Sequence, residues 1–314
     1  MPRWVHGICP VCASHRFRVL GRVDPERCRL LPPAGSCIAV CADCNLVRAE
    51  PMPHWSGADL QVLYGEGYFP AYSAAWQRRR AHDIPARRLR CIEKHLRAPG
   101  RSLLEIGAGV QAFLCRYAAA RGWDVTAQEP SHQFAAELLR QWPDLPILGG
   151  SFLDLDASRR WSVVYADSVL EHVPDPVPYF EKAAQLLEPG GVLYFVSPNE
   201  RSLANRLTTW RQRRTTGVAS ELCPYFGSFH LIGYSRRAVE ILARRARLRL
   251  VRFERRHDYA WLRELESSAG LRRWPRAAWR WLVDRIGLGS NLEVVLRADR
   301  GASAPGSIES WARS

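Results

Sequence analysis

The chain has 314 residues and a formal net charge of +14, from 45 lysines and arginines against 31 aspartates and glutamates. Hydrophobic residues make up 47% and charged residues 24%, a globular composition that excludes a disordered or fibrous chain. No apolar run approaches the ~18 residues that a membrane-spanning helix needs, and the start of the chain lacks the apolar segment of a signal peptide. We therefore expect a cytoplasmic protein, in which the nine cysteines are metal ligands or buried thiols rather than disulfides.

The positive charge comes almost entirely from arginine, since Lys94 and Lys182 are the only lysines. The arginines are spread along the whole chain rather than gathered in one segment. A nucleic-acid-binding surface requires a basic stripe on one face, which a sequence alone does not reveal. The sequence therefore favours a solvated basic surface and leaves a nucleic-acid interface open.

Two Cys-x-x-Cys pairs open the chain, with 28 residues between them. Each pair can place two thiolates on one tight turn, and two such turns complete a tetrahedral Zn²⁺ site with no position open for catalysis. We therefore predict a structural zinc. The predicted ligands are Cys9, Cys12, Cys41 and Cys44. Cys28 and Cys37 lie between the pairs and are the rival ligands.

Composition divides the chain into modules. The proline-rich stretch 51–57 marks a boundary, which predicts a zinc-ribbon module over residues 1–57 and a helical connector over residues 58–98. Residues 300–314 carry no periodicity and are expected to form a disordered tail.

Residues 99–299 alternate short apolar runs with helical patterns, which is typical of an α/β fold with a parallel sheet. The expected strands cover 102–106, 124–128, 147–148, 162–166, 192–196, 248–253 and 292–296, and the expected helices cover 76–96, 112–121, 133–142, 179–187 and 238–246. A sharp turn at 189–191 is expected to lead into the fifth strand. We expect two insertions, a lid over 199–234 and a helical segment over 258–290.

A glycine turn follows the first strand of this domain. Gly107 and Gly109 permit positive φ and let a ligand approach the main chain closely. Glu129 ends the next strand, where an acid can bond the hydroxyls of a ribose in either NAD or S-adenosylmethionine. Glu105 favours S-adenosylmethionine, because a carboxylate there repels a pyrophosphate and attracts an ammonium group. The alternative is a tight turn beside a buried acid, with no ligand.

The segments 105–109, 128–131 and 167–176 come in order, and the segments 187–192, 197–199 and 230–235 continue the pattern. Together they resemble the class I S-adenosylmethionine-dependent methyltransferases, in the small-molecule branch that includes the ubiquinone O-methyltransferases. The resemblance covers roughly residues 100–255. It implies a Rossmann-like sheet of seven strands, with the cofactor over the carboxyl ends of the first strands.

The same resemblance implies the residues that hold the cofactor. Glu105, Gly107, Ala108 and Gly109 would hold the methionine end, and Glu129 with Pro130 the ribose. Phe152 and Leu153, or Asp154, would border the adenine, and Asp167 and Ser168 would lie towards the sulfonium. Gln111 stands where many members carry a third glycine, which is a departure from the family pattern.

Two histidines are candidate general bases. His172 follows the expected fourth strand, and His230 lies in the expected lid. The alternatives are a helix-start histidine bonded within its motif and a packed lid residue, respectively. In the ubiquinone branch this region carries a Glu-x-x-Glu-His motif implicated in divalent-cation binding. Ser168 replaces the first glutamate here, so the sequence does not support such a cation site.

The segments 41–47, 50–53 and 63–68 resemble the N-terminal zinc module of nucleotide-sugar C-methyltransferases. In that family the module helps to wall the substrate site, and a histidine at the position of His230 acts as base beside a tyrosine and a glutamate. Gly227 and Phe229 stand at the neighbouring positions in this chain. The sequence therefore favours O- or N-methylation over C-methylation.

The stretch 203–214 and the stretch 271–286 both combine apolar residues, tryptophans and arginines. Such helices can lie on an anionic membrane, bind a phosphorylated substrate or simply cover a sheet edge. The pattern alone does not decide between these three roles, although it slightly favours the last.

The leading prediction is methylation of a small molecule by S-adenosylmethionine, with structural zinc. The acceptor class is a sugar or glycan precursor, including a nucleotide- or lipid-linked sugar, or a secondary metabolite. A zinc-ribbon RNA methyltransferase is the alternative enzyme. A non-catalytic interaction protein on a degenerate methyltransferase fold is the third interpretation.

Overall fold

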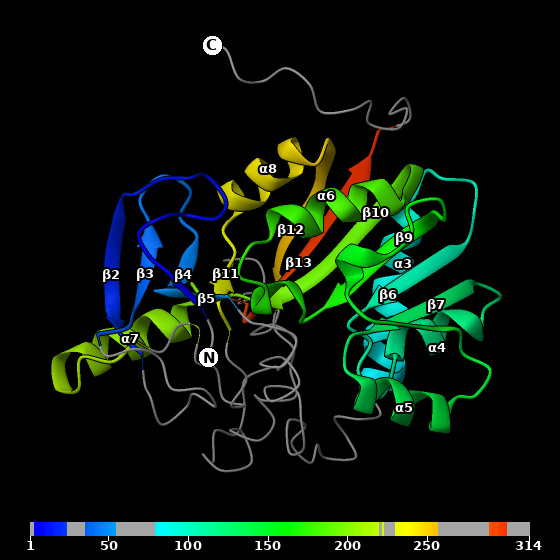
Figure 1. Cartoon of the computed structure of the whole chain (residues 1–314), viewed down its shortest axis with the longest axis horizontal. Helices are drawn as coiled ribbons and strands as arrows, with labels where there is room; N and C mark the ends of the chain where they lie inside the picture. Colours follow the sequence, from blue (N-terminus) through cyan, green and yellow to red (C-terminus); the bar gives the residue numbers. More distant parts are fainter. Residues whose placement is uncertain are drawn as a thin grey trace, which may run out of the picture.

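The computed structural model describes residues 3–23, 35–54, 79–219, 222, 230–256 and 289–299. These residues form a central sheet flanked by helices and a smaller sheet at the N-terminal end of the chain (Figure 1). Predictions for the 58–78 part of the connector, for the insertion 258–290 and for the tail lie wholly or largely outside the described residues. Within the described part, no helix is long and apolar enough to cross a membrane.

The central sheet has seven strands in the order β12-β13-β10-β9-β6-β7-β8. Their bounds are β6 Ser102–Ile106, β7 Asp124–Glu129, β8 Ile147–Gly149, β9 Trp161–Asp167, β10 Leu187–Pro198, β12 Leu248–Arg256 and β13 Asn291–Ala298. β13 runs antiparallel to both of its neighbours, whereas the pairs within β10-β9-β6-β7-β8 are parallel. The predicted seven-stranded α/β fold is confirmed.

Helices cover both faces of this sheet. The helices are α3 Ile84–His95, α4 Phe113–Ala119, α5 His132–Gln141, α6 Val177–Leu186 and α8 Arg236–Arg245, and a π-helical turn, Arg79–Asp83, precedes α3. Strand side chains alternate between two cores: Val164 packs with α6 and α8, whereas Val163 and Tyr165 pack with α3 and α4. The result is a three-layer sandwich in which the parallel strands β6 to β10 all end at one edge of the sheet (Figure 1).

The fifth strand differs from its predicted form. β10 begins at Leu187, so the predicted turn at 189–191 lies inside the strand, where the pairing with β9 shifts register between Leu187 and Val192. Gly190 has a φ of +80°, and its carbonyl accepts hydrogen bonds from the N–H groups of Arg97 and Ala98. The glycine therefore makes an irregularity that ties the end of α3 to the sheet.

The N-terminal module contains a four-stranded sheet in the order β11-β4-β3-β2 and a separate β1-β5 pair. Their bounds are β1 Arg3–Val5, β2 Phe17–Arg22, β3 Cys37–Cys41, β4 Val47–Glu50, β5 Met52–His54 and β11 Ile232–Gly233. β11 comes from the stretch expected to form the lid, and it pairs with β4 through Ile232–Arg48 and Gly233–Val47. The small sheet is therefore completed by a strand from the middle of the large domain.

Candidate functional site

The glycine turn connects β6 to α4 and takes a backbone that only glycine adopts without strain. Gly107 and Gly109 have φ values of +58° and +60°. A Cβ atom on Gly107 would lie 2.6 Å from Cγ2 of Val169. The Gly107 N–H donates to Oε1 of Gln128 over 3.2 Å, and the Gly109 N–H donates to Oε2 of Glu129 over 2.7 Å. Two side chains at the end of β7 thus hold the turn in place.

Glu129 is buried at the end of β7 and accepts two backbone hydrogen bonds, from Gly109 over 2.7 Å and from Ser131 over 2.8 Å. Burial raises the pKa of its carboxyl group, whereas the two N–H donors oppose that rise. A carboxylate offers about four lone-pair positions, so Glu129 keeps acceptor capacity for hydroxyl groups. Its neighbour Pro130 is exposed.

Glu105 is buried in β6, and its Oε2 accepts a hydrogen bond of 2.7 Å from the Cys115 N–H in the first turn of α4. Burial raises the pKa of the Glu105 carboxyl to about 7. A neighbouring cation would favour its ionised form. Gln111, the departure from the family pattern, accepts a 3.3 Å hydrogen bond from Arg116 at its Oε1, so its side chain is turned along α4.

The remaining predicted cofactor residues lie in the turns that follow β8 and β9. Phe152 is buried and stacks on Tyr179 of α6 at 5.8 Å between ring centroids, while Leu153 is half-buried and Asp154 exposed in the same turn. Ala108 is half-buried in the glycine turn.

Asp167 ends β9 and forms an ion pair of 2.6 Å with the buried Arg88 of α3. Ser168 follows it with a φ of +59° and an exposed side chain. The ion pair with Arg88 of α3 thus fixes the position of the Asp167 carboxylate at the end of β9.

His230 lies beside a buried carboxylate. Its Nδ1 is 3.1 Å from Oε1 of Glu200, which follows β10. Oε2 of Glu200 accepts hydrogen bonds from the Leu222 N–H over 2.8 Å and from Nδ2 of Asn205 over 3.2 Å. A Cβ on Gly233 would lie 2.6 Å from Glu200, so β11 leaves room for this side chain only because it carries a glycine there. Both carboxylate oxygens are engaged, and the histidine ring is held in one orientation.

The structure brings the two candidate histidines together. The rings of His172 and His230 meet edge to face, with centroids 4.9 Å apart. Glu171 joins them, so that one ligating atom of each of the three residues lies within 4.8 Å of the others. Glu171 is fully buried, and burial holds the pKa of its carboxyl well above the usual range.

The four predicted zinc ligands also converge. The ligating atoms of Cys9, Cys12, Cys41 and Cys44 lie within 4.8 Å of one another. The Sγ atoms are 3.5 Å apart for Cys9 and Cys44 and 3.6 Å apart for Cys12 and Cys41, close to the ~3.8 Å edge of a tetrahedron with Zn–S bonds of ~2.3 Å. The hydrogen bond with the Cys44 thiol lowers the pKa of the Cys9 thiol to about 5. This donor set fits a zinc ion that would supply structural stability and no reactivity.

Each cysteine pair closes the same backbone turn. The Ala13 N–H donates to the Cys9 carbonyl over 2.9 Å, and the Asn45 N–H donates to the Cys41 carbonyl over 3.0 Å. Ala13 and Asn45 both have left-handed φ values, +56° and +57°. Cys37, the described rival ligand, lies outside the four-cysteine group.

Main-chain hydrogen bonds connect the cysteine module to the histidine. The Ala49 N–H of β4 donates to the Leu231 carbonyl over 3.0 Å, and the Leu231 N–H donates to the Glu171 carbonyl over 2.8 Å. Ser235 Oγ donates to the Cys44 carbonyl over 2.5 Å and caps α8. The residue after His230 is therefore held between the module and the end of β9.

A cavity of about 710 Å³ lies where the module meets the carboxyl edge of the sheet. Asn45 of the second cysteine turn, Asn199 after β10 and the start of α8 line it. Five arginines and one glutamate also line it: Arg201, Arg236, Arg237, Arg244, Arg255 and Glu240. This cavity is strongly basic.

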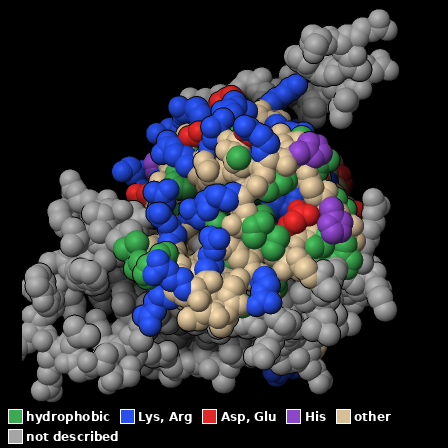
Figure 2. All heavy atoms as spheres, turned by 90° about the vertical axis from the view of Figure 1, so that its left-hand side faces the viewer, with side chains coloured by type: hydrophobic (Ala, Val, Ile, Leu, Met, Phe, Trp, Pro, Cys, Tyr) green, Lys and Arg blue, Asp and Glu red, His purple; other side chains and the backbone are tan. Residues whose placement is uncertain are grey.

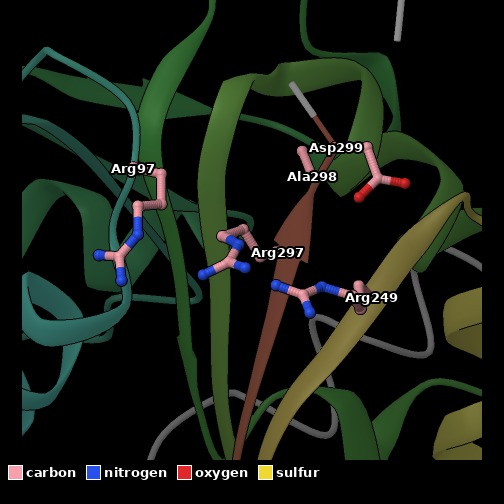
Figure 3. A pocket seen from close by; sticks show the side chains of 5 residues that line it. All are labelled: Arg97, Arg249, Arg297, Ala298 and Asp299. Carbon is pink, nitrogen blue, oxygen red and sulfur yellow. The ribbon is translucent and has the colours of Figure 1, made fainter. Parts of the chain in front are cut away.

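A smaller cavity of about 290 Å³ lies at the amino ends of the parallel strands, the edge opposite the glycine turn. Figure 3 shows Arg97, Arg249 and Arg297 around it, with Asp299 at the margin. Arg249 and Arg297 stand directly opposite each other on β12 and β13. Its position separates it from the predicted cofactor residues.

Sequence reasoning missed three side chains that shape this site: Gln128, Arg88 and Glu200. Gln128 lies in the segment 128–131 that carries the family resemblance, but only the structure shows that it bridges Gly107 and the carbonyl of Gly150. Glu200 lies just after the fifth parallel strand, a position that could have been recognised as the ligand edge. The role of Arg88 could not be recognised in the sequence, because it is one of several arginines on α3.

Comparison with known proteins identifies a family for the central domain. The family described as methyltransferase domain matches residues 76–238, just over half of the chain. The ubiquinone biosynthesis O-methyltransferases of Stutzerimonas stutzeri (strain A1501) and Azotobacter vinelandii (strain DJ / ATCC BAA-1303) are 28% and 29% identical over 129 and 132 residues. Each match covers 39% of this chain and 55% of the relative, so the chain spans about half the length of these curated relatives.

Similar solved structures include magnesium protoporphyrin IX methyltransferase from Synechocystis PCC 6803, with a TM-score of 0.49, 11% identity and coverage of 76% of this chain and 93% of that one. Geranyl diphosphate C-methyltransferase from Streptomyces coelicolor A3(2) gives a TM-score of 0.47 and 16% identity, with 74% and 86% covered. The family match and the strand order lead to one conclusion. The chain belongs to the methyltransferase-domain family, and its seven-stranded domain is a class I S-adenosylmethionine-dependent methyltransferase domain.

Proposed function

We propose that the protein transfers a methyl group from S-adenosylmethionine to an oxygen or nitrogen atom of a small molecule. The observation that carries this proposal is the pairing of His230 with Glu200 at the edge where the parallel strands end. The glycine turn, Glu105 and Glu129 belong to the same edge. A cofactor-binding turn and an oriented base at one edge are what a methyltransferase of this class requires.

The cofactor-binding roles follow the positions of the side chains. Glu105 is proposed to attract the ammonium group of S-adenosylmethionine, the turn from Gly107 through Ala108 to Gly109 to accommodate its carboxylate, and Glu129 beside Pro130 to accept its ribose hydroxyls. Phe152, Leu153 and Asp154 are proposed to border the adenine, with Asp167 and Ser168 towards the sulfonium. The cofactor supplies a methyl group on a good leaving group, and the protein contributes alignment.

His230 is the proposed general base. Glu200 accepts a hydrogen bond from protonated Nδ1, which leaves Nε2 free of a proton and able to take one from an acceptor hydroxyl or amine. His172 lies against the same ring and is the rival base. Because Glu200 is held by two further hydrogen bonds, we propose that it is a positioning residue rather than a proton acceptor.

The basic cavity of about 710 Å³ supports an acceptor that carries negative charge, such as a phosphorylated sugar or glycan precursor. The N-terminus of α8, at Ser235, adds the positive end of a helix dipole to this cavity. A cavity of this size suits a small molecule, since pockets for such ligands measure about 300–1,000 Å³.

Cofactor affinity is expected to rise with pH because of Glu105. With a pKa of about 7, its carboxyl is mostly protonated at pH 6 and mostly ionised at pH 8, and only the ionised form attracts the ammonium group. S-adenosylhomocysteine should therefore bind about ten-fold more tightly at pH 8 than at pH 6. Calorimetric titrations at both pH values measure this, with Glu105→Gln expected to abolish the difference. Glu137→Gln is the control, because the Glu137 carboxylate pairs with Arg140 on α5, away from the glycine turn. An unchanged pH dependence in Glu105→Gln would contradict the proposed role.

The function is tested with purified, zinc-loaded protein, methyl-labelled S-adenosylmethionine and fractionated cell extract. We expect label in the small-molecule fraction, in components that carry a phosphate group. Label in ribonuclease-sensitive material would contradict the proposal and support the RNA alternative. Anion-exchange chromatography of the labelled fraction then distinguishes phosphorylated acceptors from uncharged ones.

A further inference from the structure

Helix α7, Leu203–Thr215, exposes apolar side chains and buries polar ones, which is the reverse of a helix that only covers a protein core. Its apolar residues point outward: Leu203, Leu207 and Trp210 are 39%, 54% and 54% exposed. Its polar residues Ser202 and Thr209 are 4% and 5% exposed. An outward apolar stripe of this kind marks an interaction surface rather than a buried helix face.

Hydrogen bonds on the inner face fix this orientation. The Ser202 hydroxyl caps the helix by accepting from the Asn205 N–H over 3.3 Å. Nδ2 of Asn205 donates to Oε2 of Glu200 over 3.2 Å and to its carbonyl over 3.3 Å. Turning the helix by half a turn would bury the apolar stripe and break these contacts. The outward stripe is therefore a consequence of the contact with Glu200.

Basic side chains flank the stripe on both sides, and one, Arg214, lies on the stripe itself at the carboxyl end of the helix. Arg206, Arg211, Arg213 and Arg214 are exposed, and the helix contains no acidic residue. At about 100° per residue, Arg206 and Arg213 fall on one side of the stripe and Arg211 on the other. The guanidinium of Arg214 lies 4.1 Å from the centroid of the Trp210 ring.

The surrounding face has the same character. Figure 2 shows the side of the molecule that carries β2 and the end of α7, where basic side chains far outnumber acidic ones and lie beside hydrophobic ones. The α7 surface therefore continues into a larger basic face.

We infer that α7 docks on the surface of an anionic lipid bilayer. A helix that lies in a membrane interface places leucines and a tryptophan among the acyl chains and arginines at the level of the negative headgroups. The stripe and both arginine flanks of α7 match this arrangement. An acidic protein partner would attract the arginines, but its charge would not account for the exposed apolar stripe. Docking through α7 does not depend on the proposed methyl acceptor.

Sedimentation with lipid vesicles tests the inference on the full, zinc-loaded chain. We expect binding to vesicles of phosphatidylcholine with about 30% phosphatidylglycerol, weakening with added salt, and at least ten-fold weaker binding to pure phosphatidylcholine. The double variant Leu207→Ser/Trp210→Ser is expected to lose at least ten-fold in partition coefficient. The matched control Leu139→Ser changes an equally exposed leucine, 51%, on α5 and should bind normally.

The charge contribution is tested separately. Arg211→Gln/Arg213→Gln should weaken vesicle binding at least three-fold more than Arg90→Gln/Arg121→Gln, which removes the same charge from exposed sites elsewhere. Unchanged S-adenosylhomocysteine affinity verifies that the variants are folded. Absence of binding to anionic vesicles, or equal loss in both arginine pairs, would overturn the inference. Self-association that is lost in Leu207→Ser/Trp210→Ser would assign the stripe to a second copy of the chain instead.

Discussion

Replacing His230 by glutamine is expected to lower the rate of methyl transfer by about 10²- to 10⁴-fold, the usual contribution of a general base. The imidazole is buried, and its Nδ1 lies 3.1 Å from Oε1 of Glu200, so Nε2 is the proposed proton acceptor. Glutamine can keep a hydrogen bond to Glu200 but cannot take up the proton. Initial rates at saturating S-adenosylmethionine measure the effect, and S-adenosylhomocysteine affinity should stay within about two-fold of wild type.

Two further variants separate positioning from catalysis. Glu200→Gln keeps the size of the side chain but removes the charge that holds the ring tautomer, so it should lower kcat with little change in KM and move the pH–rate profile. His172→Gln is the matched comparison, because the His172 ring contacts the His230 ring edge to face. If His172→Gln lost the activity and His230→Gln retained it, the assignment of the base would be wrong.

Loss of the four-cysteine site is expected to unfold the N-terminal module and to inactivate the enzyme. Structural zinc contributes about 10–16 kcal/mol in small zinc-dependent peptides, far more than a sheet of this size supplies from its own core. Cys44→Ser removes one ligand from the group, and the Cys44 carbonyl also receives the Ser235 hydrogen bond that anchors α8. Because the Ala49 N–H holds the Leu231 carbonyl, the disruption should reach His230.

Metal content by mass spectrometry and hydrogen exchange over β3, β4 and β11 measure this outcome. We expect about one zinc per wild-type chain, and in Cys44→Ser loss of the metal with rapid exchange in all three strands. Cys37→Ser is the control, since Cys37 lies outside the cluster and should leave metal content and rate unchanged. Full activity in metal-free protein would show that the module has no part in the active site.

The large sheet could be predicted from the sequence because each of its signals is local. β6 and its glycine turn occupy the predicted residues, since an apolar run and the φ requirement of Gly107 act over a few residues. The cysteine group was predictable for the same reason, because each turn contains both members of a pair. The capping hydroxyl of Ser131 starts α5 one residue before its predicted start, a shift within the usual uncertainty of helix ends.

The pairing of His230 with Glu200 could not be predicted, because the two residues are 30 positions apart and meet only through tertiary packing. The same holds for β11, which joins a sheet formed by the first 50 residues of the chain. Nor does the pattern of α7 reveal its orientation. Its apolar stripe suggested a core-facing helix as readily as an exposed one, and the contact between Asn205 and Glu200 decides between them.

Binding of S-adenosylhomocysteine tests the proposed methyltransferase function without any knowledge of the methyl acceptor. Calorimetric titration of the zinc-loaded protein should give one site per chain. Gly107→Ala should abolish that binding, because alanine at a φ of +58° is strained and its Cβ would lie 2.6 Å from Val169. Absence of binding to the folded wild-type protein would contradict the proposed methyltransferase function and favour a non-catalytic interaction protein built on a methyltransferase fold.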